Sequence, residues 1–265
     1  MDLGFKGKVA LITGAGSQVG LGKEIAILLA REGCDKIAVT DINPVDVEKT
    51  AEAVKSLGCQ SLAIKADITQ KAEVVSMVKQ VVEKYGKIDI LCNVAGAILH
   101  KDNTPLEQQD GEIWAKQINL NLFGTMLVTQ AVIPHMKAQN YGVIVNIGSG
   151  STHQYSMGVG MYAMSKAAID VFTKQLAMTE GKSGIRANCV APGPVPTNFG
   201  QVLREGLPPL TEEQMRERRA KMAQMTPVGR LGTPADIANA VAFMASDISG
   251  NVTGQVLHVS GGRVM

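Results

Sequence analysis

Cysteine is scarce in this sequence, and the few copies are not spaced for metal binding. The 265 residues include Cys34, Cys59, Cys92 and Cys189. Their spacings match neither a zinc-binding pattern nor a CxxC redox motif. We therefore expect buried, reduced thiols in a reducing compartment, and no metal site.

The sequence also lacks an excess of charge of one sign and any long apolar run. Its formal net charge is +2, whereas a nucleic-acid-binding protein usually presents a strongly basic face. No apolar stretch approaches the roughly 18 residues of a membrane-spanning helix, and the opening MDLGFKGKVALIT does not resemble a secretory signal. These absences predict a cytoplasmic protein that binds neither nucleic acid nor a membrane.

Apolar runs of strand length alternate with segments of helical periodicity along the chain. The expected strands are residues 8–13, 36–40, 61–65, 87–92, 143–147, 185–190 and 255–259. The expected helices are residues 22–31, 44–57, 70–85, 112–137, 161–180 and 234–245. Strands that alternate with helices in this way pair in parallel, with helices on both faces. The pattern predicts one α/β domain over residues 1–265, a three-layer, doubly wound parallel sheet of about seven strands.

A glycine-rich loop, GAGSQVGLG at residues 14–22, follows the first expected strand. Glycines permit a tight turn and let backbone N–H groups approach a pyrophosphate, and the N-terminus of the next helix favours negative charge. The loop does not fit a P-loop, because Glu24 follows Gly22-Lys23. It therefore predicts a dinucleotide site.

An acidic residue ends the second expected strand. Asp41 follows Gly20 at close to the spacing of about 20 residues expected for a ribose-binding acid. Its carboxylate can accept hydrogen bonds from ribose hydroxyls, and it would repel the 2′-phosphate of NADP. No Arg or Lys stands at residues 15–19, Ile42 or Asn43 to attract that phosphate. We expect NAD in preference to NADP.

Tyr162 and Lys166 lie four residues apart in an expected helix. Positions i and i+4 share one helix face, so the phenol and the ammonium can meet. A free Tyr has a pKa of about 10. An ammonium about 4 Å away contributes on the order of 4 kcal/mol at an effective dielectric constant of about 20, which equals roughly three pKa units. The pair therefore predicts a phenol that exchanges protons near neutral pH.

Together these motifs resemble the short-chain dehydrogenase/reductase family, in its single-domain form, over nearly the whole chain. The segment Asn93-Val94-Ala95-Gly96 stands where the family has N-N-A-G, with Val in place of the second Asn. Ser149, which precedes Tyr162 by 13 residues, matches the family's catalytic serine. Asn121, in an Asn-Leu-Phe-Gly segment, matches its catalytic asparagine.

The resemblance implies a Rossmann-type fold with a catalytic tetrad of Asn121, Ser149, Tyr162 and Lys166. Tyr162 would exchange a proton with the substrate oxygen, and Ser149 would hydrogen-bond the same oxygen. Lys166 would lower the pKa of Tyr162 and hold the nicotinamide ribose, while Asn121 would anchor a water in a proton relay. NAD would carry the hydride, and no metal is implied.

The resemblance also implies a cofactor site that extends beyond the glycine loop. Asp67 stands where the family contacts adenine, and residues 192–197 stand where it holds the nicotinamide amide. The full set of expected cofactor-binding residues is Gly14, Ser17, Gln18, Val19, Gly20, Leu21, Gly22, Asp41, Ile42, Asp67, Ile68, Asn93, Ala95, Gly96, Tyr162, Lys166, Pro192, Gly193, Val195 and Thr197.

The glycine loop departs from the family's T-G-x-x-x-G-x-G pattern. Five residues, instead of three, separate Gly14 from Gly20, so the phosphate loop is two residues longer. The pattern leaves open which of Ser17, Gln18 and Val19 faces the phosphates.

Substrate contacts are expected between the catalytic serine and tyrosine, where the family lines its substrate pocket. The candidates are Ser149, His153, Tyr155 and Tyr162, although a solvated loop suits His153 equally well. No role follows for His258, because its spacing to the other histidines is not that of a ligand set.

Three methionines, Met157, Met161 and Met164, cluster near the same place. They could form an adaptable apolar pocket. For Met164 we expect packing in the core instead.

Residues 198–225 interrupt the alternation, because they contain no strand pattern. Thr211 to Gln214 read as a capping box that begins a helix, with Glu212–Arg216 and Glu217–Lys221 as i,i+4 pairs. We expect this insertion to act as a substrate lid. Its basic residues would either attract a phosphate of coenzyme A or an acyl carrier, or form a solvated helix face.

The expected activity is the NAD-dependent interconversion of a secondary alcohol and a ketone. A 3-oxoacyl-thioester reductase or a hydroxyacyl-CoA dehydrogenase is the main enzymatic alternative. A non-catalytic NAD-binding sensor or scaffold on the same fold is the alternative of another class. The resemblance implies a homotetramer.

Overall fold

The computed structural model describes residues 2–100, 104–154, 158–199, 208 and 210–265, and these residues contain one seven-stranded sheet. Its strands are β1 (Val9–Thr13), β2 (Lys36–Asp41), β3 (Gln60–Lys65), β4 (Ile90–Asn93), β5 (Gly142–Ile147), β6 (Ile185–Pro192) and β7 (Val256–Val259). Their spatial order is β3-β2-β1-β4-β5-β6-β7, and every neighbouring pair is parallel. The predicted doubly wound sheet is confirmed.

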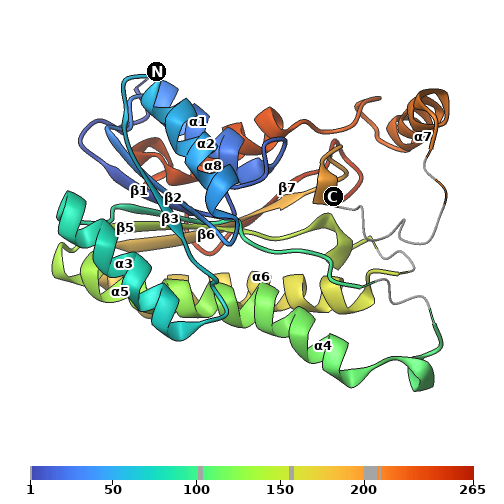
Figure 1. Ribbon diagram of the computed structural model, residues 1–265, viewed down its shortest axis with the longest axis horizontal. Helices are drawn as coiled ribbons and strands as arrows, with labels where there is room; N and C mark the ends of the chain where they lie inside the picture. The colour runs from blue at the N-terminus through green and yellow to red at the C-terminus, as the bar shows by residue number, and fades with distance from the viewer. Residues whose placement is uncertain (1, 101–103, 155–157, 200–207, 209) are drawn as a thin grey trace.

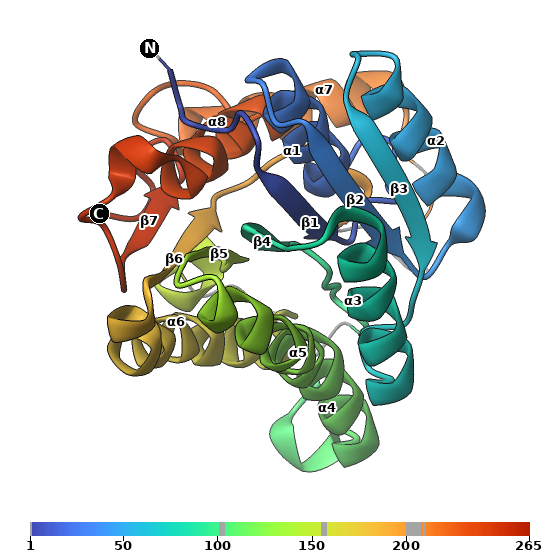
Figure 2. The same ribbon diagram turned by 90° about the vertical axis from the view of Figure 1, so that its left-hand side faces the viewer.

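Helices cover both faces of the sheet (Figure 2). One face carries α1 (Leu21–Arg31), α2 (Pro44–Lys55) and α8 (Pro234–Ala245), and the other carries α3 (Lys71–Tyr85), α4 (Gly111–Ile118), α5 (Thr125–Ala138) and α6 (Gly160–Glu180). A further helix, α7 (Glu212–Gln224), stands apart from these layers, beyond the carboxyl ends of the strands (Figure 1). The three-layer prediction is therefore also confirmed.

Alternate residues of each strand enter different cores. In β1, Ala10 and Ile12 pack in the core that contains α1, α2 and α8, whereas Val9 and Leu11 pack in the core that contains α3 and α5. All five residues of β1 are buried. Burial on both faces explains why the strands read as continuous apolar runs.

The long helix expected at residues 112–137 is two α-helices joined by a π-helical turn. This turn spans Asn119–Gly124, between α4 and α5. Gly124 lies close against Ile68, since a Cβ on Gly124 would come within 2.7 Å of Ile68 Cδ1. π-Turns inside helices occur frequently at functional sites, and this one carries Asn121.

Helix α7 and one residue of α6 are exposed to solvent. The predicted capping box of α7 is present, with Thr211 Oγ1 accepting from Gln214 N at 3.2 Å, but α7 has no buried residue. Met164 on α6 is 55% exposed, so the expectation that it packs in the core is wrong. Among the described helices, none is both long and apolar enough to cross a membrane.

The order of the strands positions the candidate residues. The connections run outward in opposite directions from β1 and β4, which places a crevice at their carboxyl ends. Gly14, Asp41 and Asp67 follow or end β1, β2 and β3, while Gly96 and Ser149 follow β4 and β5. The predicted sites therefore meet at one edge of the sheet.

Candidate active site

The glycine loop leaves β1 in close contact with the segment that follows β4. Gly14 has a φ of +68°, and a Cβ there would lie 2.6 Å from backbone atoms of Ala95. Thr13 Oγ1 accepts hydrogen bonds from the amides of Val94 and Ala95, both at 3.1 Å. A Cβ on Gly22 would collide with the carbonyl of Gly14. The glycines thus allow the close approach that forms a backbone cradle at the start of α1, which suits a pyrophosphate.

The inserted part of the loop has an inward and an outward side. Ser17 and Val19 are exposed, whereas the Gln18 side chain points toward α2. Its Nε2 donates to the carbonyls of Gly16 at 2.8 Å and Asp46 at 2.9 Å. Ser17 and Val19 can therefore face a bound phosphate, but the Gln18 side chain is occupied within the protein.

Asp41 is fixed at the end of β2, beside the glycine loop. Its Oδ2 accepts from the amide of Gly16 at 2.8 Å, and its Oδ1 accepts from the amide of Asn43 at 3.1 Å. Ile42 is 62% exposed beside it. Asp67 Oδ1 accepts hydrogen bonds from the amide and the hydroxyl of Thr69. Two carboxylates at this end suit hydroxyl and amino donors better than a phosphate.

The four residues of the predicted tetrad lie close together, and two of them approach Gly96. A Cβ on Gly96 would lie 2.8 Å from Asn121 Oδ1 and 3.4 Å from Lys166 Nζ. Lys166 Nζ is 5.9 Å from the centroid of the Tyr162 ring, and the Ser149 hydroxyl lies close enough to Tyr162 to act on its pKa. Only a glycine leaves room for this arrangement.

Backbone carbonyls hold two of these side chains. Asn121 donates to the carbonyl of Ala97 at 2.9 Å and to Ser165 Oγ at 3.2 Å, and its Oδ1 accepts from the amide of Ala97 at 2.9 Å. Lys166 Nζ donates to the carbonyl of Ile147 at 2.8 Å. Both side chains are therefore fixed before any ligand arrives.

Burial dominates the protonation of the Tyr–Lys pair. It raises the pKa of Tyr162 to about 12, against the lowering effect of the hydrogen bond with Ser149. It lowers the pKa of Lys166 to about 8, while Cys189 and Asp170 act to raise it. The pKa of Tyr162 therefore lies above its ordinary value and not near neutrality as expected, because desolvation of the buried phenolate is the largest influence on it.

The segment after β6 lies against the end of β7. The amide of Gly193 donates to the carbonyl of Val259 at 2.9 Å, and the amide of Gly232 donates to the carbonyl of Pro194 at 3.2 Å. The amide of Thr197 donates to the carbonyl of Val195 at 2.9 Å. This turn places residues 192–197 at the carboxyl end of the sheet, as the nicotinamide assignment requires.

A buried polar ladder beneath the site was missed by sequence reasoning. Asn93 Nδ2 donates to Thr129 Oγ1 at 3.0 Å and to Asn146 Oδ1 at 2.9 Å, and Asn146 Nδ2 donates to Thr173 Oγ1 at 2.9 Å. Its one sequence signal is Asn146, a polar residue in the apolar run VIVNI. Asn93 therefore joins β4, β5, α5 and α6, and its side chain supports the site from below.

The substrate candidates have different surroundings. His153 is exposed, and its ring lies 4.7 Å from that of His258 in an edge-to-face contact. Tyr155 and Met157 lie outside the described residues. Phe199, which the sequence did not single out, contacts the Tyr162 ring edge-to-face with centroids 5.4 Å apart. Phe199 is thus an additional apolar neighbour of the catalytic phenol.

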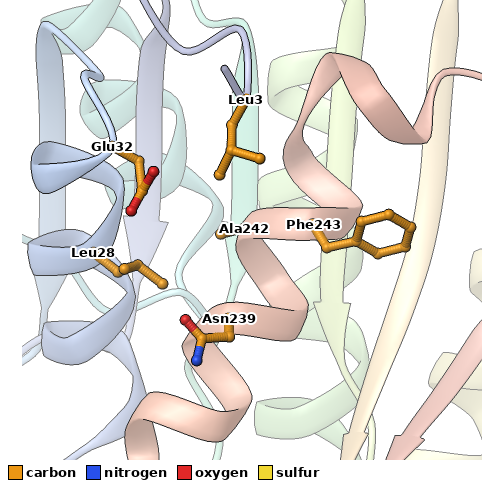
Figure 3. A pocket seen from close by; sticks show the side chains of 6 residues that line it. All are labelled: Leu3, Leu28, Glu32, Asn239, Ala242 and Phe243. Carbon is orange, nitrogen blue, oxygen red and sulfur yellow. The ribbon is translucent and has the colours of Figure 1, made fainter. Parts of the chain in front are cut away.

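A shallow hollow lies away from this site, between the end of α1 and α8 (Figure 3). Its lining residues are Leu3, Leu28, Glu32, Asn239, Ala242 and Phe243. Leu3 precedes β1, so the hollow lies toward the amino end of that strand, whereas the tetrad lies at the carboxyl ends. None of the predicted site residues lines it.

Comparisons with known proteins agree with this geometry. A family model described as enoyl-(acyl carrier protein) reductase matches residues 14–263. The chain is 40% identical to a (2S)-[(R)-hydroxy(phenyl)methyl]succinyl-CoA dehydrogenase subunit of Thauera aromatica, covering 98% of each chain. It is 36% identical to a 3-oxoacyl-[acyl-carrier-protein] reductase of Thermotoga maritima, covering 98% of this chain and 99% of the relative.

A solved structure gives the same result. A 7α-hydroxysteroid dehydrogenase complexed with NADH and 7-oxo glycochenodeoxycholic acid superposes with a TM-score of 0.88 at 36% identity, covering 98% of this chain and 96% of the other. The fold, the family model and these relatives all point to the same family. The chain belongs to the short-chain dehydrogenase/reductase family and is an oxidoreductase that acts on CH–OH groups.

Proposed function

We propose that this protein is an NAD-dependent dehydrogenase/reductase that interconverts a secondary alcohol and a ketone, with Tyr162 as its acid–base group. The observation that carries the proposal is the grouping of the tetrad: Asn121 and Lys166 approach Gly96, Tyr162 lies beside Lys166, and Ser149 acts on the pKa of Tyr162. The glycine cradle at α1 opens onto the same edge of the sheet. Its backbone fits a dinucleotide, which supplies the hydride when bound.

The residues of the chain then supply position and protons. Tyr162 gives a proton to the ketone oxygen or takes one from the alcohol, and Ser149 hydrogen-bonds the same oxygen. Lys166, with a pKa lowered to about 8, keeps most of its charge at neutral pH and stabilises the negative charge that builds up on the phenol. Asn121, already bonded to Ala97 and Ser165, is held in place to anchor a water in a proton relay.

The preference for NAD rests on Asp41. Its carboxylate is held by two backbone amides at the end of β2, where it can accept hydrogen bonds from ribose hydroxyls and repel a 2′-phosphate. NADH in the hydroxysteroid dehydrogenase structure supports a nicotinamide cofactor. The selection of NAD is our proposal from Asp41.

A thioester substrate is the second candidate. The succinyl-CoA dehydrogenase relative and the acyl-carrier-protein reductase relative both act on thioesters by name. In this chain Arg216, Arg218, Arg219 and Lys221 are exposed on α7, where they can meet the phosphates of such a carrier. Neither predicted α7 ion pair, Glu212–Arg216 or Glu217–Lys221, is formed among the described residues, which leaves these cations available.

We also propose a homotetramer in the cytoplasm. Exposed apolar side chains recur on α6 and on α8 with β7, including Val171, Met178, Phe243 and Leu257. Two separate apolar faces on one chain are what a closed tetramer of two-fold contacts requires. The four buried, unpaired cysteines support a reducing compartment.

The test follows nicotinamide absorbance with NAD or NADP against a panel of secondary alcohols, ketones and hydroxyacyl thioesters. We expect turnover with NAD in the wild type and a loss of at least about 100-fold in kcat for Tyr162→Phe, because positioned acid–base groups contribute about that much. Tight NAD binding without turnover on any substrate would favour the sensor alternative. Preference for NADP would contradict the role assigned to Asp41.

A further inference from the structure

The longer glycine loop is fastened to α2 by hydrogen bonds on its inner side. Gln18 Nε2 donates to the carbonyl of Asp46, in the first turn of α2, at 2.9 Å and to the carbonyl of Gly16 within the loop at 2.8 Å. Thr50 Oγ1, one turn further along α2, donates to the carbonyl of Ala15 at 2.7 Å. The loop therefore has a defined position against α2, although it is two residues longer than the family pattern.

Two lysines near Asp41 also have partners within the protein. Lys23 Nζ, from the first turn of α1, donates to Gln18 Oε1 at 2.8 Å. Lys49 Nζ, on α2, pairs with Asp46 Oδ1 at 2.8 Å. Neither lysine is directed to Asp41. A dinucleotide phosphate at this point would have to draw one of them away from its present partner.

The backbone donors at this end are also occupied. The amide of Gly16 donates to Asp41 Oδ2 at 2.8 Å, and the amide of Asn43 donates to Asp41 Oδ1 at 3.1 Å. A Cβ on Gly16 would lie 2.6 Å from the Asp41 carboxyl carbon, so the loop and the carboxylate are in direct contact. A 2′-phosphate needs cations or N–H groups as partners. Here both kinds of partner are already bonded within the protein.

We propose, building on the NAD-dependent function proposed above, that Gln18 is a positioning residue for dinucleotide selection. Its amide nitrogen holds the Gly16 peptide so that the Gly16 amide stays on Asp41, and its amide oxygen holds Lys23 away from the adenosine 2′ position. Gln18 thereby favours NAD and disfavours NADP without touching either. The two extra loop residues then contribute to the selection of NAD over NADP in this chain.

The test measures the Kd values of NAD and NADP by isothermal titration calorimetry for the wild type, Gln18→Leu and Gln18→Leu/Lys23→Met. Leu has a similar volume and makes no hydrogen bonds. We expect Gln18→Leu to weaken NAD binding roughly fivefold to tenfold, the effect of one lost net hydrogen bond, and to strengthen NADP binding because Lys23 is released. The double variant should bind NAD as weakly as Gln18→Leu does. It should not show the stronger NADP binding, because Lys23 is no longer present to contact the 2′-phosphate.

Controls separate this proposal from the function on which it rests. Gln80→Leu makes the same replacement on the exposed face of α3, where Gln80 bonds only within its own helix, and should leave both Kd values unchanged. Gln18→Ala, with its thermal midpoint recorded, replaces Gln18→Leu if the larger side chain prevents folding. If the wild type binds NAD tightly and the Gln18 variants have the same ratio of NAD to NADP Kd values as the wild type, only the role of Gln18 is overturned. A wild type that binds neither dinucleotide overturns the proposed function as well.

Discussion

Lys166 is a lysine held almost entirely out of water, with 4% of its surface exposed. Burial lowers its pKa to about 8, and Cys189 on β6 and Asp170 on its own helix act in the opposite direction. Asp170 Oδ1 in turn accepts a hydrogen bond from the Cys189 thiol at 3.4 Å. The charge of Lys166 therefore depends on a carboxylate one helical turn away that touches neither substrate nor cofactor in our proposal.

This arrangement predicts the alkaline side of the pH profile for ketone reduction. Reduction needs protonated Tyr162, whose pKa is raised to about 12, and charged Lys166. We expect kcat/KM for reduction to be flat near neutrality and to fall as the pH rises through about 8, where Lys166 loses its proton. Asp170→Asn should move this fall to lower pH, because it removes a negative charge that raises the lysine pKa.

Stopped-flow or steady-state reduction between pH 6 and 10 checks this expectation. Asp247→Asn, a carboxylate at the opposite end of the sheet beside Tyr141, is the matched control and should leave the profile unchanged. An identical profile for wild type and Asp170→Asn would show that Asp170 has no electrostatic effect on Lys166.

The residues of the candidate site were predictable from the sequence where their spacing alone places them together. Tyr162 and Lys166 had to share a helix face once a helix was assumed, and Gly96 and Ser149 followed from their positions after strands. The direction of the tyrosine pKa was not predictable, because it depends on burial that only the packed structure defines. The inward turn of Gln18 likewise depends on carbonyls of α2 that are distant in sequence.

At the scale of elements, α7 and α8 begin with the same device. Thr211 caps α7 and Thr233 caps α8, each in a complete capping box. Thr233 works with Asp236, whose carboxylate also binds Arg230 through two hydrogen bonds at 2.7 and 2.9 Å. Helix α8 is largely buried against α1, whereas α7 has no buried residue.

The two caps should therefore differ in their contribution to stability. We expect Thr233→Ala to lower the free energy of unfolding by about 1 kcal/mol, the usual cost of a lost N-cap, because α8 unfolds with the core. Thr211→Ala should leave global unfolding unchanged, because α7 can fray by itself. Urea unfolding followed by circular dichroism checks both variants, and equal losses would contradict the distinction.

The stability that the α8 cap contributes depends on pH. The hydrogen bond from Arg230 is the main reason that the pKa of Asp236 is held below its ordinary range. A carboxyl with a lowered pKa in the folded state stabilises fully above its unfolded value of about 4 and loses this effect as the pH falls through the folded value. The difference in free energy of unfolding between wild type and Thr233→Ala should thus become smaller as the pH is lowered into the acid range.

Strands and helices were predictable because each has a period in the sequence, and the π-turn was not. Residues 112–137 keep a helical pattern throughout, and one wide turn does not disturb it enough to be noticed. The cap of α7 was readable from four residues, since its hydrogen bonds are local. Where an element depends on contacts with another element, as at Asn93 and Asn146, the sequence carried only a weak signal.

At the scale of the whole molecule, α6 presents an unpartnered apolar stripe. Met164, Val171 and Met178 are spaced seven residues apart and are 55%, 65% and 84% exposed. That spacing places them along one side of the helix. The stripe could not be separated from core packing in the sequence, because the same pattern serves both purposes.

The proposed tetramer predicts a clear effect of charge on this stripe. Val171→Glu or Met178→Glu should convert tetramers into smaller species, because a buried unpaired carboxylate opposes association. Size-exclusion chromatography with light scattering measures the mass. Met215→Glu, which places the same charge on α7, is the control and should remain tetrameric. A wild type that is monomeric at micromolar concentration would contradict the proposal.

The four cysteines have a consequence for following the motions of this protein. All are buried, and burial raises the pKa of Cys34, Cys59 and Cys92 to about 12, 11 and 12 and that of Cys189 as well. A thiol in this state does not react with an alkylating reagent until its surroundings open. Cys34 and Cys59 lie at the β2–β3 side of the sheet, and Cys92 and Cys189 lie within β4 and β6. The unmodified protein therefore carries built-in reporters whose labelling rates compare the opening of its edge with the opening of its centre.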